Sequence, residues 1–487
     1  MPEREQMSGV DTAWLRMGRP GNPMMIAGVM VFADPLDIGR VRETIRSRFL
    51  SFSRFRQRPV EETTGTHWET DSEFDLERHV RRVGLPGAAG KADLEELVSD
   101  LVSTPLDPSR PRWQFDLVEH YRGGSALVAR IHHCYADGIA LMRVLLSLTD
   151  PSPNAAGPAA AAEVQDELAH DPWSQLFAPI TETVAGALRL GGLLWQDYIE
   201  LVTHPMRAVG YAGRGLDIAA EAGRLALMSG DSPTRLKGRL SGVKRVAWAE
   251  PMALPEIKQV GMSLGCSIND VLVAAVAGAL RSYLESQGDS VDGVEVRAIV
   301  PVNLRPAGHD DALGNHFGLV FLELPLGIAN PLARLYEVGR RMRELRHSSQ
   351  PVFVLGLLGA VGMGPKFIEE QVLDVLSRNA SMVITNVPGP HEPLYMAGAR
   401  LTEHVFWVPQ AGNIGIGISI LSYAERVHFG VIADKHLVAD PHAIVDRIPL
   451  EFDTLLLATL MHPWGERPDP DAAEAKIREW LSPGACA

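Results

Sequence analysis

Apolar runs that end at short polar turns predict the strands of this chain. Residues 126–131 form a nearly continuous apolar run, as expected of a buried strand. A short turn containing His132, His133 and Asp137 follows. After Gly138 the apolar residues take helical spacing, at Ile139, Leu141, Met142, Leu145 and Leu146. Two histidines are therefore expected at a strand end, where buried structure meets an opening.

The turn combines a helix cap with two adjacent histidines. Asp137 is a good N-cap, because its carboxylate can accept amide hydrogens of the first helical turn. Neighbouring strand residues point to opposite faces, so His132 and His133 are expected to do different things. An unperturbed imidazole titrates near pH ~6.5 and can accept a hydroxyl proton at neutral pH. Two structural histidines beside an ordinary cap are the alternative.

The same periodicity predicts further strands and helices along the chain. Strands are expected at residues 24–32, 111–119, 243–248, 296–302, 317–324, 381–387, 413–420 and 426–432. Helices are expected to start at Asp11 and to cover residues 41–50, 256–262 and 268–284, with Ser267 as the cap of the last. Strands that alternate with helices in this way predict an α/β fold.

A short echo within the chain predicts a duplicated architecture. His133 to Gly138 and His436 to Pro441 both follow an apolar strand, and both contain the pattern His-x-x-Ala-Asp before Gly or Pro. We expect two copies of one fold with a cleft between them. The second copy lacks paired histidines and is expected to complete the cleft structurally.

Composition suggests where the halves divide. Residues 151–173 are rich in Pro, Ala and Gly, as in a linker, and residues 176–229 have amphipathic helical spacing. We therefore predict an N-terminal domain at 1–150, a linker and helical crossover at 151–240, and a C-terminal domain at 241–487. The apolar face of 176–229 either packs on the protein's own core or docks on a lipid surface.

Charge and cysteine content narrow the function. The net charge of −14 argues against a nucleic-acid partner and a generally basic membrane-binding surface. Three scattered cysteines do not form a disulfide framework, which favours a reducing cytosol. No apolar run reaches the ~20 residues that span a bilayer, so attachment to lipid would be peripheral.

Other catalytic motifs are weak. Gly261-x-Ser263-x-Gly265 matches a nucleophile elbow, but a helix precedes the serine where a strand is required. No phosphate-binding glycine loop follows a strand, so ATP and NAD chemistry are unsupported. Neighbouring histidines converge poorly on a metal, and no second ligand cluster lies near them in the sequence.

The pattern His132-His133-x-x-x-Asp137-Gly138 resembles the HHxxxDG signature of the CoA-dependent acyltransferase superfamily. That superfamily includes chloramphenicol acetyltransferase and peptide-synthetase condensation domains. Almost the whole chain resembles bacterial wax ester synthases/acyl-CoA:diacylglycerol acyltransferases. The motifs that carry this narrower resemblance are Pro111-x-Trp113, Asn269-Asp270, Pro301-Val302-Asn303-Leu304-Arg305, Gly314-Asn315 and Asn386-Val387-Pro388-Gly389-Pro390.

The resemblance implies a fold and a reaction. It implies two chloramphenicol-acetyltransferase-like domains, each a mixed sheet with helices, joined by a helical linker. It also implies transfer of a long-chain acyl group from CoA to a fatty alcohol or diacylglycerol, with no cofactor and no metal. His133 would be the general base and Asp137 would order the turn. Arg112 and Asn303 depart from the family's usual leucine and serine.

Several residues remain candidates with two interpretations each. Trp113 lines the acyl route or simply packs, and Asn269 and Asp270 order the cleft or start a helix. Donors to the oxyanion are expected from the second domain, with Asn386, Ser419 and Ser422 as candidates. Arg305 and the cluster Arg235-Leu236-Lys237-Gly238-Arg239 either meet CoA phosphates or lie in a solvated loop.

The proposed chemistry is direct transfer from acyl-CoA, without an acyl-enzyme, in a tunnel that excludes water. A cytoplasmic protein, held peripherally at a membrane or lipid droplet, is the expected setting. Two rivals remain: an acyltransferase or condensation enzyme of the same fold that uses a carrier-protein thioester, and a non-catalytic lipid-droplet binding protein.

Overall fold

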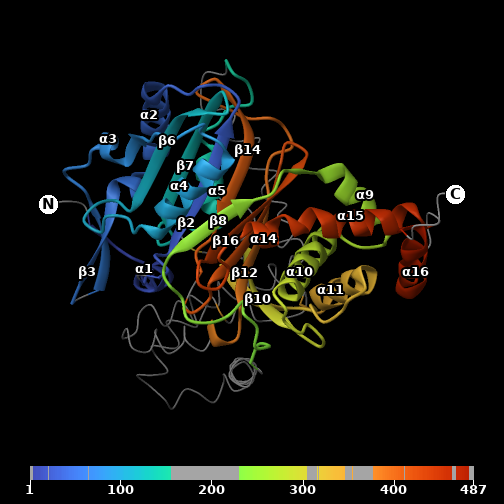
Figure 1. The fold of residues 1–487 in the computed structure, drawn as a ribbon. Coiled ribbons are helices and arrows are strands. Elements are labelled where there is room, and N and C mark those ends of the chain that lie inside the picture. Colours follow the sequence, from blue (N-terminus) through green and yellow to red (C-terminus); the bar gives the residue numbers. More distant parts are fainter. Residues whose placement is uncertain are drawn as a thin grey trace, which may run out of the picture.

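The computed structural model describes residues 4–19, 21–63, 65–154, 230–303, 315, 317–345, 354, 377–410, 412–462 and 468–481. These residues form two large mixed β-sheets with helices packed on them, so the predicted α/β class is confirmed. In Figure 1 the blue and cyan N-terminal elements lie on one side, and helices α10, α11 and α15 lie on the opposite side, against the C-terminal strands.

The N-terminal sheet forms from strands with long apolar runs. β2 (Met25–Phe32) and β7 (Gly124–His132) are buried along their whole length and pair antiparallel. β7 also pairs antiparallel with β6 (Trp113–Tyr121), and β6 pairs parallel with the short β5 (Val80–Arg82). Helix α5 (Gly138–Leu146) begins just after β7 and packs its apolar residues onto this sheet. The predicted strand, turn and helix around the histidines are confirmed.

The C-terminal sheet contains the strands predicted in the second half of the chain. Its strands, in spatial order, are β11 (Phe317–Leu324), β10 (Val296–Asn303), β12 (Met382–Pro388), β15 (Ile416–Tyr423), β16 (Arg426–Asp434) and β8 (Lys244–Trp248), with β9 (Met252–Ala253) beside β16. One face packs on helices, and the other face meets the N-terminal half.

The two sheets repeat the same succession of strand directions. β2, β7, β6 and β5 pair antiparallel, antiparallel and parallel. β8, β16, β15 and β12 pair in the same succession. β7 leads through a turn to α5, and β16 leads through a turn to α14 (His442–Val445). The duplication that the short sequence echo predicted is therefore confirmed in strand order and direction.

One strand crosses from the second half of the chain into the first sheet, which the sequence did not predict. β14 (Ala399–Trp407) pairs antiparallel with β2 and, at its outer side, with β13 (Tyr395–Met396). It lies close against the C-terminal sheet at a position that is glycine. A Cβ on Gly430 would lie 2.7 Å from Val405 Cγ1 and 2.8 Å from Trp407 Nε1, both on β14.

The helices complete the two halves. In the N-terminal half they are α1 (Gly9–Arg16), α2 (Ile38–Ser47), α3 (Leu76–His79), α4 (Lys91–Ser103) and the short η1 (Phe49–Ser51) and η2 (Ser53–Arg56). A small sheet of β1 (Arg4–Gln6), β4 (Gly65–Thr70) and β3 (Gln57–Glu62) lies beside them. In the C-terminal half they are α9 (Leu254–Ser263), α10 (Ile268–Ser286), α11 (Pro331–Leu345), α15 (Arg447–Leu460) and α16 (Pro470–Leu481).

Two expectations concern regions that the structure describes only partly. The helical region 176–229 lies outside the described residues, and so does most of the linker 151–240, so the domain boundaries remain a prediction. Among the helices that are described, none alone has the length and apolar character to cross a bilayer. α9 and α10 together pass that test, but they are bent by 99° relative to each other.

Candidate active site

A cavity lies where the two halves meet. Its volume is about 800 Å³, including the space at its open mouth. The walls come from α1, the turn after β7, strands β10, β11 and β12, and the segment around the end of β14. The lining residues are Trp14, His133, Asp137, Gly138, Ile299, Pro301, Val302, Phe317, Leu319, Val383, Thr385, Asn386, Val387, Phe406, Val408, Pro409 and Ile414. Apolar side chains dominate this wall, with a few polar groups among them.

His133 is held in this wall by contacts from both halves. Its main-chain N–H donates to the Met24 carbonyl at 2.8 Å. Its ring stacks on Trp14 with centroids 4.3 Å apart, and the Phe317 ring lies tilted to it at 5.5 Å. His133 is only 4% exposed. The expectation that His133 faces an opening between two domains agrees with this position.

Burial sets the protonation state of His133. Desolvation lowers the pKa of the imidazole to about 4, and the Asp137 carboxylate and the Asn315 side chain act in the opposite direction. The sequence predicted an imidazole that is neutral at neutral pH. With a pKa of about 4, the imidazole is neutral over a wider pH range than an unperturbed histidine. The same burial makes the imidazole a weaker base than a solvated histidine.

His132 points elsewhere. It ends β7 and does not line the cavity, and its Nδ1 accepts a hydrogen bond from the Cys134 main-chain N–H at 3.2 Å. Burial, with a further contribution from Arg112, lowers its pKa well below the usual value. The two neighbouring histidines thus lie in different surroundings, and their different roles stay a prediction.

Asp137 caps helix α5 as predicted. Its Oδ1 accepts from the Ala140 main-chain N–H at 2.9 Å. Asp137 and Gly138 both line the cavity, so the cap fixes the start of α5 at the cavity wall beside His133. Asp137 therefore orders the turn and also places a carboxylate near the imidazole.

Asn386 lines the cavity, and its side chain also meets that of Asn269. The Asn386 Nδ2 donates to Asn269 Oδ1 at 2.7 Å, which ties β12 to the start of α10. Asp270 closes the cap of α10: its Oδ2 accepts from the Ser267 main-chain N–H at 2.9 Å. Asp270 and Asn269 thus start a helix, and Asn269 also anchors the strand that lines the cavity.

The two serine candidates for oxyanion donors lie away from the cavity. Ser419 Oγ donates to the Gly430 carbonyl at 3.4 Å, beneath β14. Ser422 Oγ accepts from the Gly389 main-chain N–H at 3.3 Å. Neither residue lines the cavity around His133. Both make local contacts within the C-terminal sheet and the turn beside it.

The remaining candidates do not join the site either. Trp113 is buried in the N-terminal core, where its Nε1 donates to the Phe55 carbonyl at 2.8 Å, so it packs. Arg235 binds Asp289, with Nη2 3.0 Å from Oδ1. Lys237 donates to the Arg378 carbonyl. Arg305 lies outside the described residues.

Thr385 is a polar cavity residue that the sequence interpretation missed. Its hydroxyl is buried and has no hydrogen-bond partner among the described residues. It shares its face of β12 with Val383 and Val387, whereas Ile384 packs with the helix-covered core. The two-residue period of a strand separates Thr385 from Asn386. Which face meets the cavity becomes clear only from the tertiary structure.

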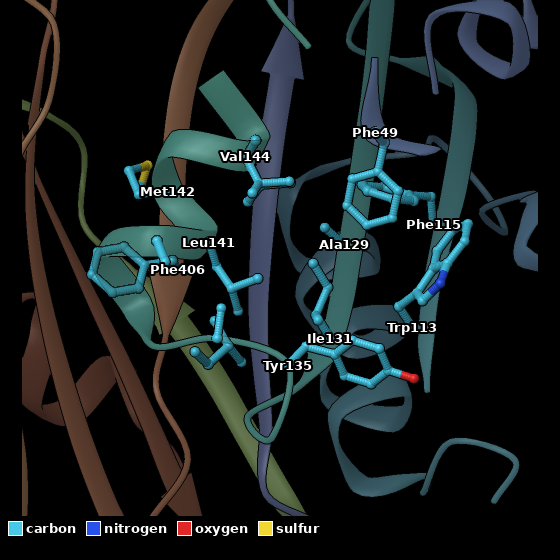
Figure 2. Close-up of a cluster of buried hydrophobic side chains, with 14 of the residues drawn as sticks. Phe49, Trp113, Phe115, Ala129, Ile131, Tyr135, Leu141, Met142, Val144 and Phe406 are labelled. Carbon is cyan, nitrogen blue, oxygen red and sulfur yellow. The ribbon is translucent and has the colours of Figure 1, made fainter. Parts of the chain in front are cut away.

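A second, smaller cavity adjoins the first through Gly138 and Phe406. It lies between α5 and strands β2 and β7, where about 310 Å³ of space is not occupied by atoms, including space open to solvent. Its walls are wholly apolar, with Ile26, Ala27, Gly28, Ala129, Ile131, Gly138, Leu141, Met142, Leu145 and Phe406. Figure 2 shows Leu141 and Met142 on α5 beside Phe406, with Ala129 and Ile131 on the adjacent strand.

The structure also bears on the Ser263 motif and on metal binding. Ser263 is at the end of helix α9, and Gly265 has the left-handed φ of +64° that follows many helix ends. The apparent nucleophile elbow is therefore a helix C-terminus. In the part of the chain that the structure describes, no group of three or more His, Cys, Asp or Glu side chains is arranged to hold a metal.

Solved structures with this fold are acyltransferases and condensation domains. The wax ester synthase/diacylglycerol acyltransferase from Marinobacter aquaeolei VT8 has a TM-score of 0.65 at 22% identity, over 94% of this chain and 100% of that one. The starter condensation domain of rhizomide synthetase, solved in complex with C8-CoA, has a TM-score of 0.55 at 13% identity, over 95% and 96%. These similarities show the fold, an α/β arrangement of two mixed sheets with helices, and they confirm the expected fold.

Sequence comparison narrows this class to a family. The wax ester synthase/diacylglycerol acyltransferase catalytic domain matches residues 7–272, and the WS/DGAT C-terminal domain matches residues 313–455. The probable diacylglycerol O-acyltransferase tgs1 of Mycobacterium tuberculosis is 29% identical over 392 residues, 80% of each chain. The chain belongs to the wax ester synthase/diacylglycerol acyltransferase family, and it is an acyltransferase of triacylglycerol or wax ester synthesis.

Proposed function

We propose that this protein is an O-acyltransferase that moves a long-chain acyl group from acyl-CoA to a fatty alcohol or diacylglycerol. The observation that carries the proposal is a neutral, buried imidazole in the wall of a largely apolar cavity, in a chain of this family. A domain of the same fold binds C8-CoA, which supports acyl-CoA as the donor.

His133 is the general base in this proposal. Its neutral imidazole accepts the proton of the acceptor hydroxyl as that oxygen attacks the thioester carbonyl. The tetrahedral intermediate then collapses, the carbon–sulfur bond breaks, and the imidazolium gives its proton to the departing CoA thiolate. No acyl-enzyme is needed, because the thioester is already activated. Consistent with this, burial raises the pKa of the Cys134 thiol far above its usual value, and Ser263 lies outside the cavity.

Thr385 replaces the serines as the candidate donor to the oxyanion. Its unpartnered hydroxyl lies in the wall of the cavity that also contains His133. A hydroxyl that has no partner in the free protein can donate to the thioester oxygen as negative charge develops there. The donor to the oxyanion is therefore still proposed to come from the second half of the chain, but from Thr385 and not from Ser419 or Ser422.

The apolar cavity under α5 is the proposed site of the donor's acyl chain. It shares Gly138 and Phe406 with the wall of the main cavity, beside the turn that carries His133. A chain that enters there buries its methylenes among aliphatic and aromatic side chains, which favours long acyl groups at about 0.8 kcal/mol per methylene. The main cavity then remains for the acceptor and the thioester.

The two rival functions are less well supported. A carrier-protein donor would match the condensation domains of similar fold, but those share only the fold with this chain, whereas the family models match most of it. A non-catalytic lipid-binding role leaves the capped histidine turn and the unpartnered hydroxyl of Thr385 without a use. Peripheral association with a membrane or lipid droplet remains part of the proposal.

Substitution of the turn residues should separate three roles. His133→Ala should fold and lose turnover by roughly 10²–10⁴, the usual contribution of general acid–base catalysis. His132→Ala should lose less turnover, because that ring lies outside the cavity. Asp137→Ala should lose turnover and also about 0.5–2 kcal/mol of stability, because it removes the cap of α5. Initial rates with palmitoyl-CoA plus hexadecanol or diacylglycerol, beside melting curves, provide the test; a folded His133→Ala with normal turnover would refute the mechanism.

Thr385→Val should lower turnover by about 10²-fold while leaving the melting temperature nearly unchanged, because the two side chains have similar shape and only the hydroxyl is lost. Thr385→Ser is the matched control, since it keeps a hydroxyl and should retain most activity. Equal rates for the valine and serine variants would show that the hydroxyl is not used.

Ala129→Leu should shorten the acyl chains that the enzyme prefers. Ala129 lies in the wall of the apolar cavity, and a leucine there would occupy space that the chain needs. The ratio of kcat/KM for C16-CoA to that for C8-CoA should fall by about 10-fold or more. Because both donors are measured with one variant, any loss of folded protein cancels. An unchanged ratio would place the acyl chain elsewhere.

Flotation with phosphatidylglycerol-containing liposomes tests peripheral association. We expect part of the protein to float, and high salt or carbonate to release it, because no described helix alone can span a bilayer. Protein that leaves the liposomes only in detergent would contradict a peripheral attachment, and protein that never floats would remove membrane association from the proposal.

A further inference from the structure

One carboxamide connects three separate parts of the chain at the candidate base. Asn315, in the segment before β11, donates from Nδ2 to Asp11 Oδ1 on α1 at 2.8 Å. The same Nδ2 donates to the main-chain carbonyl of His133 at 3.0 Å. Asn315 is 4% exposed, so both bonds are shielded from water. A residue of the C-terminal half thus holds the histidine turn of the N-terminal half.

Residues close to Asn315 also contact the imidazole of His133. Trp14, one turn along α1 from Asp11, stacks on His133, and Phe317, two residues after Asn315, packs against both rings. Asn315 Oδ1 and His133 Nδ1 are both buried, and neither makes a hydrogen bond to a described residue. The main chain of His133 itself and the Asn315 side chain both raise the pKa of the ring.

We infer that Asn315 is a positioning residue for His133. Its Nδ2 holds the His133 carbonyl and ties it to Asp11 of α1, so this bond fixes the turn from which the ring meets the cavity. The imidazole then stays in the place where it can take the proton of the acceptor hydroxyl. This inference rests on the proposed role of His133 as the base. It implies that the base is correctly set only when the two halves are docked.

The charged and titratable groups around this contact are few. Asp11 faces Asn315 from α1, Asp137 lies at the start of α5, and His132 is the neighbour in the chain. Asp137 raises the pKa of His133 through its charge, and this contribution does not depend on Asn315. A change at Asn315 should therefore shift the titration of His133 without abolishing it.

Asn22 offers a matched control for the structural part of this role. It is also a buried asparagine whose Nδ2 makes two bonds to main-chain carbonyls across the halves, to Gly412 at 3.1 Å and Ile414 at 3.3 Å. Its side chain bonds to these two carbonyls and not to the histidine turn, and it does not line the main cavity. Asn22→Ala removes a comparable bridge between the halves and leaves the histidine turn untouched.

The experiment compares Asn315→Ala with Asn22→Ala in kcat, in the pH profile of kcat/KM and in melting temperature. Both variants should lose similar melting temperature. Asn315→Ala alone should lose about 10–10²-fold in kcat, because the base is misplaced. The acid limb of its kcat/KM profile should move to lower pH. The Asn315 side chain raises the pKa of His133, so that pKa should fall further when the side chain is removed. Identical rates and pH profiles for the two variants would overturn the inference.

A second variant tests the inference even if Asn315→Ala folds poorly. In the exchange Asp11→Asn with Asn315→Asp, the amide and carboxylate swap places, so the bond between α1 and this segment is kept, whereas the bond to the His133 carbonyl is lost because a carboxylate has no proton to donate. The carboxylate at 315 then faces the imidazole and should move the acid limb to higher pH, opposite to the alanine variant. An unmoved limb would also overturn the inference. Failure of the underlying function is distinguishable, because His133→Ala would then remain active.

Discussion

Desolvation of a single imidazole is the constraint around which this molecule is arranged. His133 is removed from water by residues of both halves: Trp14 from α1, Phe317 from β11 and the main chain at Met24. Burial keeps the ring neutral, which is the state a general base requires, and weakens it as a base. The Asp137 carboxylate and the Asn315 carboxamide raise the pKa of His133 and so oppose this weakening. The fold thus balances exclusion of water against basicity at one residue.

The duplicated architecture explains how such a site can arise at a junction. Each half has the same succession of strand directions, and each places a turn at the end of an equivalent strand, at His133 to Gly138 and at His436 to Pro441. Only the first turn carries paired histidines. The second half supplies β10, β11 and β12 as the opposite wall, and β14 pairs with β2 to join the halves as one hydrogen-bonded structure.

Local features were predictable from the sequence, and contacts between distant segments were not. The strand before His132, the cap at Asp137 and the capping box at Ser267 and Asp270 follow from patterns a few residues long. The place of β14 depends on Gly430, which permits a close approach that no local pattern reveals. Likewise, Ser419 and Ser422 were reasonable hydroxyl donors by type, but only the tertiary structure shows that Thr385 faces the cavity.

Direct transfer demands that both substrates meet at one nitrogen and that water does not. The two cavities suit this requirement, because they share Gly138 and Phe406 as wall residues, next to the turn that carries the proposed base. A donor chain under α5 and an acceptor in the main cavity would approach His133 from different directions. With the cavity filled by two apolar substrates, water has little room to compete for the thioester. The geometry that excludes water from the reaction is therefore the same geometry that lowers the basicity of His133, and Asn315 lies where the two effects meet.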